Sequence, residues 1–258
     1  MNGLYLQGGG AKGAFQAGVI TGLLERGIHF QVIAATSIGA MNAYCLFTDQ
    51  LEQLKEMWLH AYAEIDRESK YLGKVFENKA IISRLAGLQG RDEKIQAFFV
   101  NYVEIHGGRP EEVVVDLTRL EKSDQLEAVK FSSLLPLRME EEMTMPEIME
   151  NYDSNRIFGE FQEGLMKGEY EGYRLDGGIL NNNLLEPFVQ KRVERLFIIP
   201  FQQDYQVPDY ITEVYHPNDL TIISPKTKLL QSDVLRFEKE FCTKMYKEGY
   251  EIGLAVQF

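Results

Sequence analysis

Short apolar runs and apolar residues at helical spacing alternate along the first part of the chain. Residues 2–7 predict a short buried strand, which is followed by a glycine-rich turn. Apolar side chains then recur at helical spacing over residues 14–26, and Gly27 is a stop signal after the last turn. A second strand is predicted over residues 30–35 and a second helix over 38–47. This repeated order of strand, turn and helix is typical of a parallel sheet.

The same patterns predict further elements along the rest of the chain. Helical spacing predicts more helices, over residues 51–65, 92–105, 123–135 and 227–250. Apolar runs predict more strands, over residues 111–116, 173–175, 196–199 and 220–223. There is no internal repeat and no linker rich in serine or glycine. With 258 residues, 45% of them hydrophobic, the chain is long enough for one α/β domain over residues 1–258.

The segment Arg138–Gly172 has the least regular pattern. It contains the acidic run Glu140–Glu142, several methionines and the loop-like run Asn151–Asn155. Methionine side chains adapt to irregular apolar ligands, and the segment leads directly into Asp176. We therefore expect it to form a mobile cover over a binding site. The alternative is a static surface insertion packed by its methionines.

The charge of the chain narrows the possible partners and locations. A formal net charge of -12 and a pI near 4.9 argue against nucleic acid and against electrostatic capture by an anionic membrane. Cys45 and Cys242 are too few for a disulfide framework and are expected to be buried thiols. No Sec-type signal pattern and no apolar run of about 18 residues is visible, so a soluble cytoplasmic protein is expected.

The glycine turn Gly8-Gly9-Gly10-Ala11-Lys12-Gly13 is the first motif with chemical meaning. Its backbone N–H groups can converge on a developing oxyanion. The spacing also fits a dinucleotide fingerprint, but that needs an acidic residue at the end of the second strand, and the next one is Asp49. A P-loop is excluded because Gly13 is followed by Ala14. A plain tight turn remains an alternative.

Ser37 lies at a corner between the second strand and the second helix. The run Ala35-Thr36-Ser37-Ile38-Gly39 resembles the nucleophile-elbow pattern G-x-S-x-G, with alanine at the first glycine position. An elbow directs the positive end of the following helix at the reaction centre, where the N–H groups of Gly9 and Gly10 can bind an oxyanion. The alternative is a serine that simply caps the helix.

A nucleophilic serine needs a base. The 4 histidines are His29, His60, His106 and His216, and none follows a recognisable strand with a matching acid. Asp176 follows a short strand and precedes Gly177-Gly178, which fits a carboxylate presented at the end of a strand. Taken alone, Asp176 also fits an ordinary Asp-Gly turn.

Taken together and in this order, the glycine turn, the Ser37 corner and Asp176-Gly177-Gly178 resemble the three motifs of the patatin-like phospholipases. The run Phe131–Pro136 is similar to the family's segment before its Asp-Gly-Gly turn, and Asn181–Pro187 is similar to the family's segment after that turn. The resemblance extends from Leu4 to about Pro200. It implies an α/β fold, namely a three-layer α/β/α sandwich with a mainly parallel central sheet.

The resemblance also implies a mechanism and its residues. Ser37 is then the nucleophile and Asp176 the base of a Ser-Asp dyad, which accounts for the missing histidine. The implied oxyanion-hole segment comprises Gly8, Gly9, Gly10, Lys12 and Gly13, and the elbow is flanked by Ala35 and Gly39. A water-poor cleft raises the pKa of an aspartate above its usual value of about 4 and makes it a better base.

The implied substrates are lipid acyl esters of the phospholipid or lysophospholipid type, cleaved without metal or organic cofactor. Transient contact with a membrane or micelle is expected. Lys12 is placed to meet a phosphate, unless it is an ordinary surface lysine. Two alternatives stay open: a nucleotide-binding module built on the glycine turn, and a lipid-binding relative with impaired catalysis.

Overall fold

A central sheet of seven strands organises the part of the chain that this computed structural model describes, residues 1–61 and 70–257. The strands are β1 (Asn2–Leu6), β2 (Val32–Ala35), β3 (Lys70–Val75), β4 (Ala97–His106), β5 (Arg109–Asp116), β6 (Pro136–Thr144), β7 (Arg174–Asp176), β8 (Arg195–Ile199) and β9 (Leu220–Ile222). The α-helices are α1 (Gly13–Glu25), α2 (Ile38–Phe47), α3 (Leu51–Glu56), α4 (Lys79–Gly87), α5 (Lys122–Ser132), α6 (Met145–Glu150), α7 (Ser154–Met166), α8 (Glu186–Gln190), α9 (Asp209–Thr212) and α10 (Lys239–Ala255). Shorter helical segments are η1 (Gly10–Lys12), η2 (Met57–Ala61), η4 (Leu117–Arg119), η5 (Gly177–Ile179), η6 (Pro217–Asp219) and η7 (Ser232–Leu235).

The sheet is mainly parallel, as the sequence predicted. Its order is β5-β4-β2-β1-β8-β9, and β1, β2, β4, β8 and β9 pair in parallel. The hairpin partner β5 and the short β7 both run antiparallel to β4. Alternate side chains of each inner strand point to opposite faces of the sheet.

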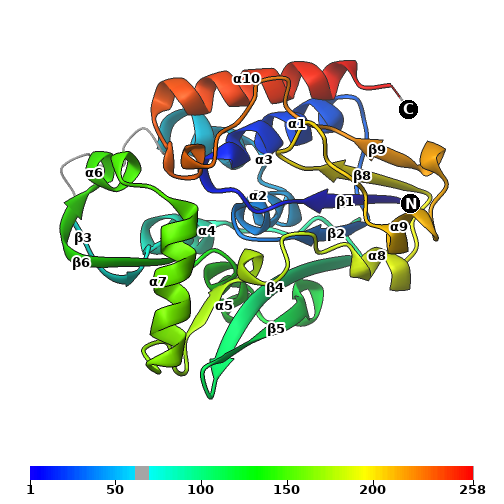
Figure 1. Cartoon of the computed structure of the whole chain (residues 1–258). Helices are drawn as coiled ribbons and strands as arrows, with labels where there is room; N and C mark the ends of the chain where they lie inside the picture. The colour runs from blue at the N-terminus through cyan, green and yellow to red at the C-terminus, as the bar shows by residue number, and fades with distance from the viewer. Residues whose placement is uncertain (62–69, 258) are drawn as a thin grey trace.

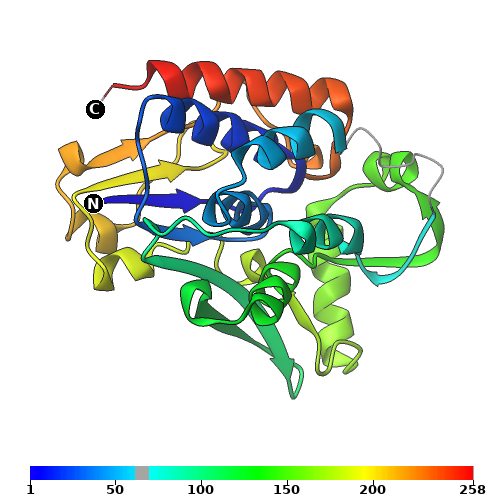
Figure 2. The same cartoon turned by 180° about the vertical axis from the view of Figure 1, so that it is seen from behind.

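Helices cover both faces of the sheet and complete a three-layer arrangement. On one face, Leu4 and Ile33 belong to a large core with α1, α2 and α10, and Figures 1 and 2 show α1 and α10 side by side there. On the other face, Tyr5 and Val32 pack with Phe188 of α8 and Ile211 of α9.

A smaller unit lies beyond the C-terminal ends of the parallel strands (Figure 1). It consists of the antiparallel pair β3–β6 with α6 and α7, and we call these four elements the cap. Phe161 and Leu165 of α7 pack against the far end of β4. Leu137 and Ile157 of the cap pack with Leu235 of η7.

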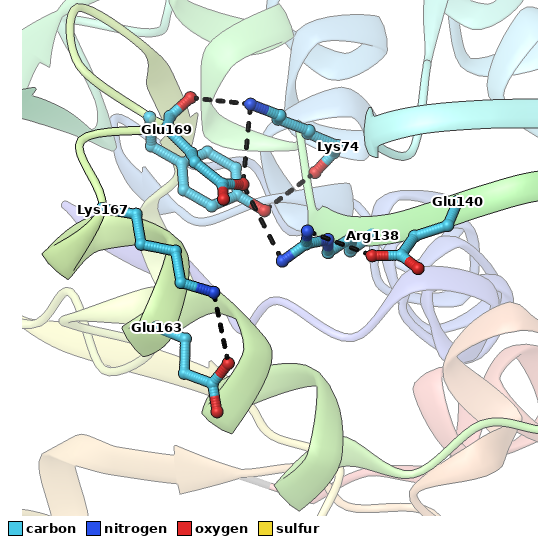
Figure 3. A network of polar contacts seen from close by, with 7 residues as sticks. Lys74, Arg138, Glu140, Glu163, Lys167 and Glu169 are labelled. Atoms are coloured by element: carbon cyan, nitrogen blue, oxygen red, sulfur yellow. Dashed lines mark hydrogen bonds and ion pairs between the residues drawn. The ribbon is translucent and has the colours of Figure 1, made fainter.

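Polar contacts fix the two cap strands to the turn that follows α7 (Figure 3). Lys74 of β3 and Arg138 of β6 approach the Glu169 carboxylate at 3.6 and 3.8 Å, and Arg138 also pairs with Glu140 at 3.0 Å. The Tyr170 hydroxyl donates a 3.3 Å hydrogen bond to the Lys74 carbonyl. Such partly exposed ion pairs each contribute little stability, and here they join β3 and β6 to the turn after α7.

Several predicted elements differ in the structure. The helix predicted over residues 92–105 is wrong: most of that range lies in β4, which neighbours β2 and β5 and has Phe98 and Phe99 on opposite faces. Because β4 is covered on both faces, it has apolar side chains at consecutive positions, and this pattern also satisfies a helical spacing. The helix predicted over 51–65 is present as α3 and η2 as far as Ala61, and its last residues lie outside the described ones.

The final helix and the cap segment also need correction. Residues 227–238 are not helical apart from η7, which packs against η1, and the last helix begins at Lys239. The segment Arg138–Gly172 is regular, because a capping box of Thr144 and Glu147 starts α6 and Asp153 caps α7. Its mobility stays a prediction.

Candidate active site

Ser37 occupies a sharp turn between β2 and α2. Its φ of 57° lies in the left-handed region, which is rare for residues other than glycine. A Cβ at Gly39 would lie 2.5 Å from the Leu6 carbonyl oxygen, so only glycine fits two residues after the serine. Ala35 is fully buried in the core, and the Ser37 side chain makes no capping hydrogen bond to α2. The local geometry is that of an elbow, and not that of a helix-capping serine.

The side chains of Ser37 and Asp176 meet directly. The Ser37 hydroxyl donates a 2.6 Å hydrogen bond to Asp176 Oδ2, and the Gly178 N–H donates a 2.8 Å bond to Oδ1. Asp176 is only 6% exposed. Burial raises the pKa of Asp176 to about 6, although its hydrogen bonds to Ser37 and Gly178 oppose that rise. The carboxylate is therefore charged at neutral pH and more basic than an ordinary aspartate.

The topology of the sheet brings these two residues together. Strands β2 and β7 pair with the same edge of β4, where Ala35 lies opposite Val100 and Asp176 lies opposite Tyr102. They approach from opposite directions, since β2 is parallel and β7 antiparallel to β4. Their C-terminal ends therefore face each other across Asn101, the single residue of β4 between the two pairings.

Asn101 bonds to both turns through its side chain. The Thr36 hydroxyl donates to Asn101 Oδ1 at 2.8 Å, and Asn101 Nδ2 donates to the Asn181 carbonyl and to Glu112 Oε1, each also at 2.8 Å. Asn101 is fully buried. Sequence reasoning missed it because its partners are 11 to 80 residues away along the chain.

The glycine turn closes the third side of the site. Gly8 and Asn182 exchange two hydrogen bonds, from the Gly8 N–H to Asn182 Oδ1 at 2.8 Å and from Asn182 Nδ2 to the Gly8 carbonyl at 3.1 Å. The Gly8 N–H is therefore already engaged. Gly10 has a φ of +56°, and a Cβ there would lie 2.0 Å from the Val234 carbonyl oxygen, so this position requires glycine.

Three backbone donors remain beside Ser37. Within the described residues, the N–H groups of Gly9, Gly10 and Ile38 have no hydrogen-bond partner. Ile38 was not among the predicted site residues. The sequence could have identified Ile38 by its position directly after Ser37, because the N–H of the residue after the nucleophile contributes to the oxyanion hole of an elbow.

A cavity of about 420 Å³ opens over Ser37 and Asp176, and Gly8, Gly9 and Gly10 also line it. Its volume lies within the range of ligand pockets. The wall is mostly apolar and is formed by α2, α4, η7, the cap and the segment after η7, with side chains that include Met41, Ile81, Ile157, Phe158, Phe161 and Phe237. Such a lining suits an acyl chain next to the polar pair.

The two remaining residues of the predicted oxyanion segment lie outside this cavity. A Cβ at Gly13 would meet Ile38 and Trp58, at 2.7 and 2.9 Å. Lys12 is half-buried; burial lowers the pKa of its amine, and nearby Asp233 opposes that shift.

The histidines lie elsewhere in the structure, and none lines this cavity. His60 and His106 are exposed and contact Glu56 and Glu104, while His216 accepts a hydrogen bond from the Asn218 N–H. Within residues 1–61 and 70–257, no group of three potential metal ligands is present. No helix in these ranges is long and apolar enough to cross a membrane.

Comparison with known proteins gives a match to one family model and likenesses to several solved structures, of which two are described. The family model described as Patatin-like phospholipase matches residues 4–189. VipD from Legionella pneumophila shares 14% identity with a TM-score of 0.43, over 98% of this chain and 66% of that chain. The ExoU–SpcU heterodimer of the Pseudomonas aeruginosa type III secretion system shares 14% identity with a TM-score of 0.38, over 99% and 52%. The chain thus spans about one half to two thirds of these two structures, and no curated protein matches it.

Proposed function

Because the chain belongs to the patatin-like phospholipase family, we propose that it is a serine hydrolase of lipid carboxylic esters that uses a Ser37–Asp176 dyad. The observation that carries this proposal is the 2.6 Å hydrogen bond from the Ser37 hydroxyl to the buried Asp176 carboxylate. Family membership supports lipid hydrolysis in general. The dyad and the apolar cavity beside it support the acyl-ester chemistry.

In the proposed reaction Ser37 Oγ attacks the ester carbonyl carbon while its proton moves to Asp176. The N–H groups of Gly9, Gly10 and Ile38 stabilise the resulting oxyanion. Asp176 then protonates the departing alcohol, which leaves the acyl group on Ser37. A water molecule attacks this acyl-enzyme and transfers a proton to Asp176. The fatty acid then departs as Ser37 recovers its proton.

The charge of the protein favours dispersed substrates. With 39 acidic and 27 basic residues, the chain is repelled by an anionic bilayer. We therefore expect lysophospholipids and short-chain or medium-chain monoesters to be cleaved faster than phospholipids packed in anionic vesicles. Half-exposed Phe158 lies in the cavity wall and gives such molecules an apolar contact at the entrance.

The test compares initial rates on a lysophospholipid, a soluble chromogenic ester and anionic vesicles, each at low and high salt. We expect hydrolysis of the first two substrates and labelling of Ser37 by a serine-directed fluorophosphonate. Absence of both would contradict the proposed function. Fastest hydrolysis of the vesicles at low salt would contradict the charge argument alone.

A further inference from the structure

The hydroxyl of Tyr152 has no hydrogen-bond partner in the described part of the chain. Tyr152 lies in the connection between α6 and α7 (Figure 1), and it lines the cavity over Ser37 and Asp176. Among the described residues, the one unpaired side-chain nitrogen or oxygen that is fully buried belongs to Asn78. The Tyr152 hydroxyl is therefore both unpaired and accessible.

Two observations place this hydroxyl on the inner side of the cap. The half-buried ring of Tyr152 packs against the apolar cluster that includes Leu137 and Leu235. Asp176 is the only charged group of the described residues that acts on the pKa of Tyr152. The exposed carboxylates of Glu150 and Asp153 are its neighbours in sequence and do not act on it. The phenol group therefore points toward the dyad and away from the outer surface.

The Tyr152 hydroxyl is a neutral hydrogen-bond donor at the working pH. Burial raises the pKa of Tyr152, and the Asp176 carboxylate adds to that rise, so the phenol stays protonated. Both Asp176 oxygens already accept a hydrogen bond, one from Ser37 and one from Gly178. In a mostly apolar pocket a few placed polar groups orient the ligand, so a free donor beside this carboxylate suits an oxygen of the substrate.

The proposed reaction identifies the substrate oxygen that lacks a donor. The carbonyl oxygen, as it becomes an oxyanion, meets the N–H groups of Gly9, Gly10 and Ile38. The oxygen of the departing alcohol meets only Asp176, which has to protonate it. Negative charge develops on this oxygen as its bond to the carbonyl carbon breaks, and a placed donor there lowers the barrier.

We propose that Tyr152 is a further catalytic residue, whose hydroxyl donates a hydrogen bond to the leaving-group oxygen while Asp176 protonates that oxygen. This inference rests on the proposed function. Tyr152 keeps its own proton, since the proton on the departing alcohol is the one that Asp176 took from Ser37. The hydrogen bond matters most for alkyl alcohols, which are poor leaving groups, and least for 4-nitrophenol, which leaves readily as an anion.

Tyr152→Phe removes the hydroxyl and keeps the ring, so it tests the proposal directly. The substrates are two esters of one acyl chain, with 4-nitrophenol and with butanol, and kcat/KM reports the acylation step for each. We expect Tyr152→Phe to lower kcat/KM by about tenfold on the butyl ester and by less than about twofold on the nitrophenyl ester. Equal losses on the two esters, or no loss on either, would overturn the inference and leave the proposed function intact. No hydrolysis of either ester by the wild type would overturn both.

Tyr173→Phe is the matched control and should leave both rates unchanged. It also removes a hydroxyl that has no partner among the described residues, but Tyr173 does not line the cavity. Labelling of Ser37 by a fluorophosphonate at the wild-type rate verifies that the dyad of Tyr152→Phe is intact. If Tyr152→Phe does not fold, Tyr152→Leu is measured on the same two esters, and equal losses would overturn the inference.

A lysophospholipid distinguishes the leaving-group oxygen from the head group as the acceptor. A contact with the leaving-group oxygen predicts that Tyr152→Phe loses activity on the lysophospholipid and on the butyl ester alike, because both release an alkyl alcohol. A loss on the lysophospholipid without a loss on the butyl ester would place the hydrogen bond on the head group and overturn the proposal.

Discussion

Thr36 is the residue before the proposed nucleophile, and its hydroxyl donates a 2.8 Å hydrogen bond to the buried Oδ1 of Asn101. The same side chain donates to the Asn181 carbonyl in the segment that follows Asp176. One amide on β4 therefore links the two turns that carry the proposed dyad. We expect the distance between Ser37 and Asp176 to depend on this link as well as on the sheet.

Replacing Asn101 should disturb this distance. We expect Asn101→Ala to lower kcat by at least about tenfold, because a misplaced catalytic group is costly. A weaker bond from Ser37 should also raise the pKa of Asp176 and move the acid limb of the pH–rate profile upwards. Glu112→Gln is the control, since it keeps an acceptor for Asn101 Nδ2. An Asn101→Ala enzyme with wild-type kcat and pH profile would contradict this role.

The pH dependence of activity should report the ionisation of Asp176. As the proposed base, Asp176 works only when it is deprotonated, and burial raises its pKa to about 6. We therefore expect kcat/KM to rise with pH through about 6 and then level off. A profile measured with a soluble chromogenic ester checks this. An acid limb near pH 4 would mean that the base is an ordinary exposed carboxylate.

The same shift predicts a pH-dependent stability. Because the folded pKa of Asp176 is about 6 and its ordinary value is 3.8, the protonated form is favoured by folding. The stability this provides is complete below about pH 4 and is lost as the pH rises through 6. Asp176→Asn stays neutral, so it should exceed the wild type in free energy of unfolding above pH 6, by up to about 3 kcal/mol. Urea unfolding at pH 4 and pH 8 measures the difference in free energy of unfolding between Asp176→Asn and the wild type. The same difference at both pH values would contradict this prediction.

The glycine turn should not tolerate a side chain at Gly10. A methyl group there would lie 2.0 Å from the Val234 carbonyl oxygen on a backbone with φ of +56°. We expect Gly10→Ala to lose most of its activity and at least about 1 kcal/mol of stability. Gly159→Ala in α7 is the matched control, because nothing lies within 4 Å of its added Cβ. Similar activities for Gly10→Ala and Gly159→Ala would show that activity does not require this conformation of the glycine turn.

Much of the site could be predicted from local sequence. The glycine turn and the elbow each combine a short strand, a required glycine and a helix within a few residues, and Gly39 and Gly10 meet the backbone approaches that these turns demand. The parallel pairing of the first two strands followed from the same repeat. These features depend on neighbours along the chain, which a sequence pattern can represent.

The rest depends on contacts that are distant in sequence. The spacing of the apolar residues in β4 fits both a helix and a strand, and only the neighbouring strands of the sheet decide between the two. Asn101 and Asn182 are ordinary polar residues in the sequence, and their roles come from partners on other elements. The cap packs against β4 and η7, and these contacts between distant segments are not visible in its own sequence.

The central claim is that Ser37 and Asp176 act as one unit in ester hydrolysis. The most direct test measures kcat/KM on a soluble chromogenic ester for Ser37→Ala, Asp176→Asn and the double variant, each with folding verified by circular dichroism. Residues that act together are strongly non-additive, so each single variant should lose at least about a thousandfold and nearly match the double variant. Folded Asp176→Asn protein with turnover comparable to the wild type would remove Asp176 from the mechanism and contradict the account.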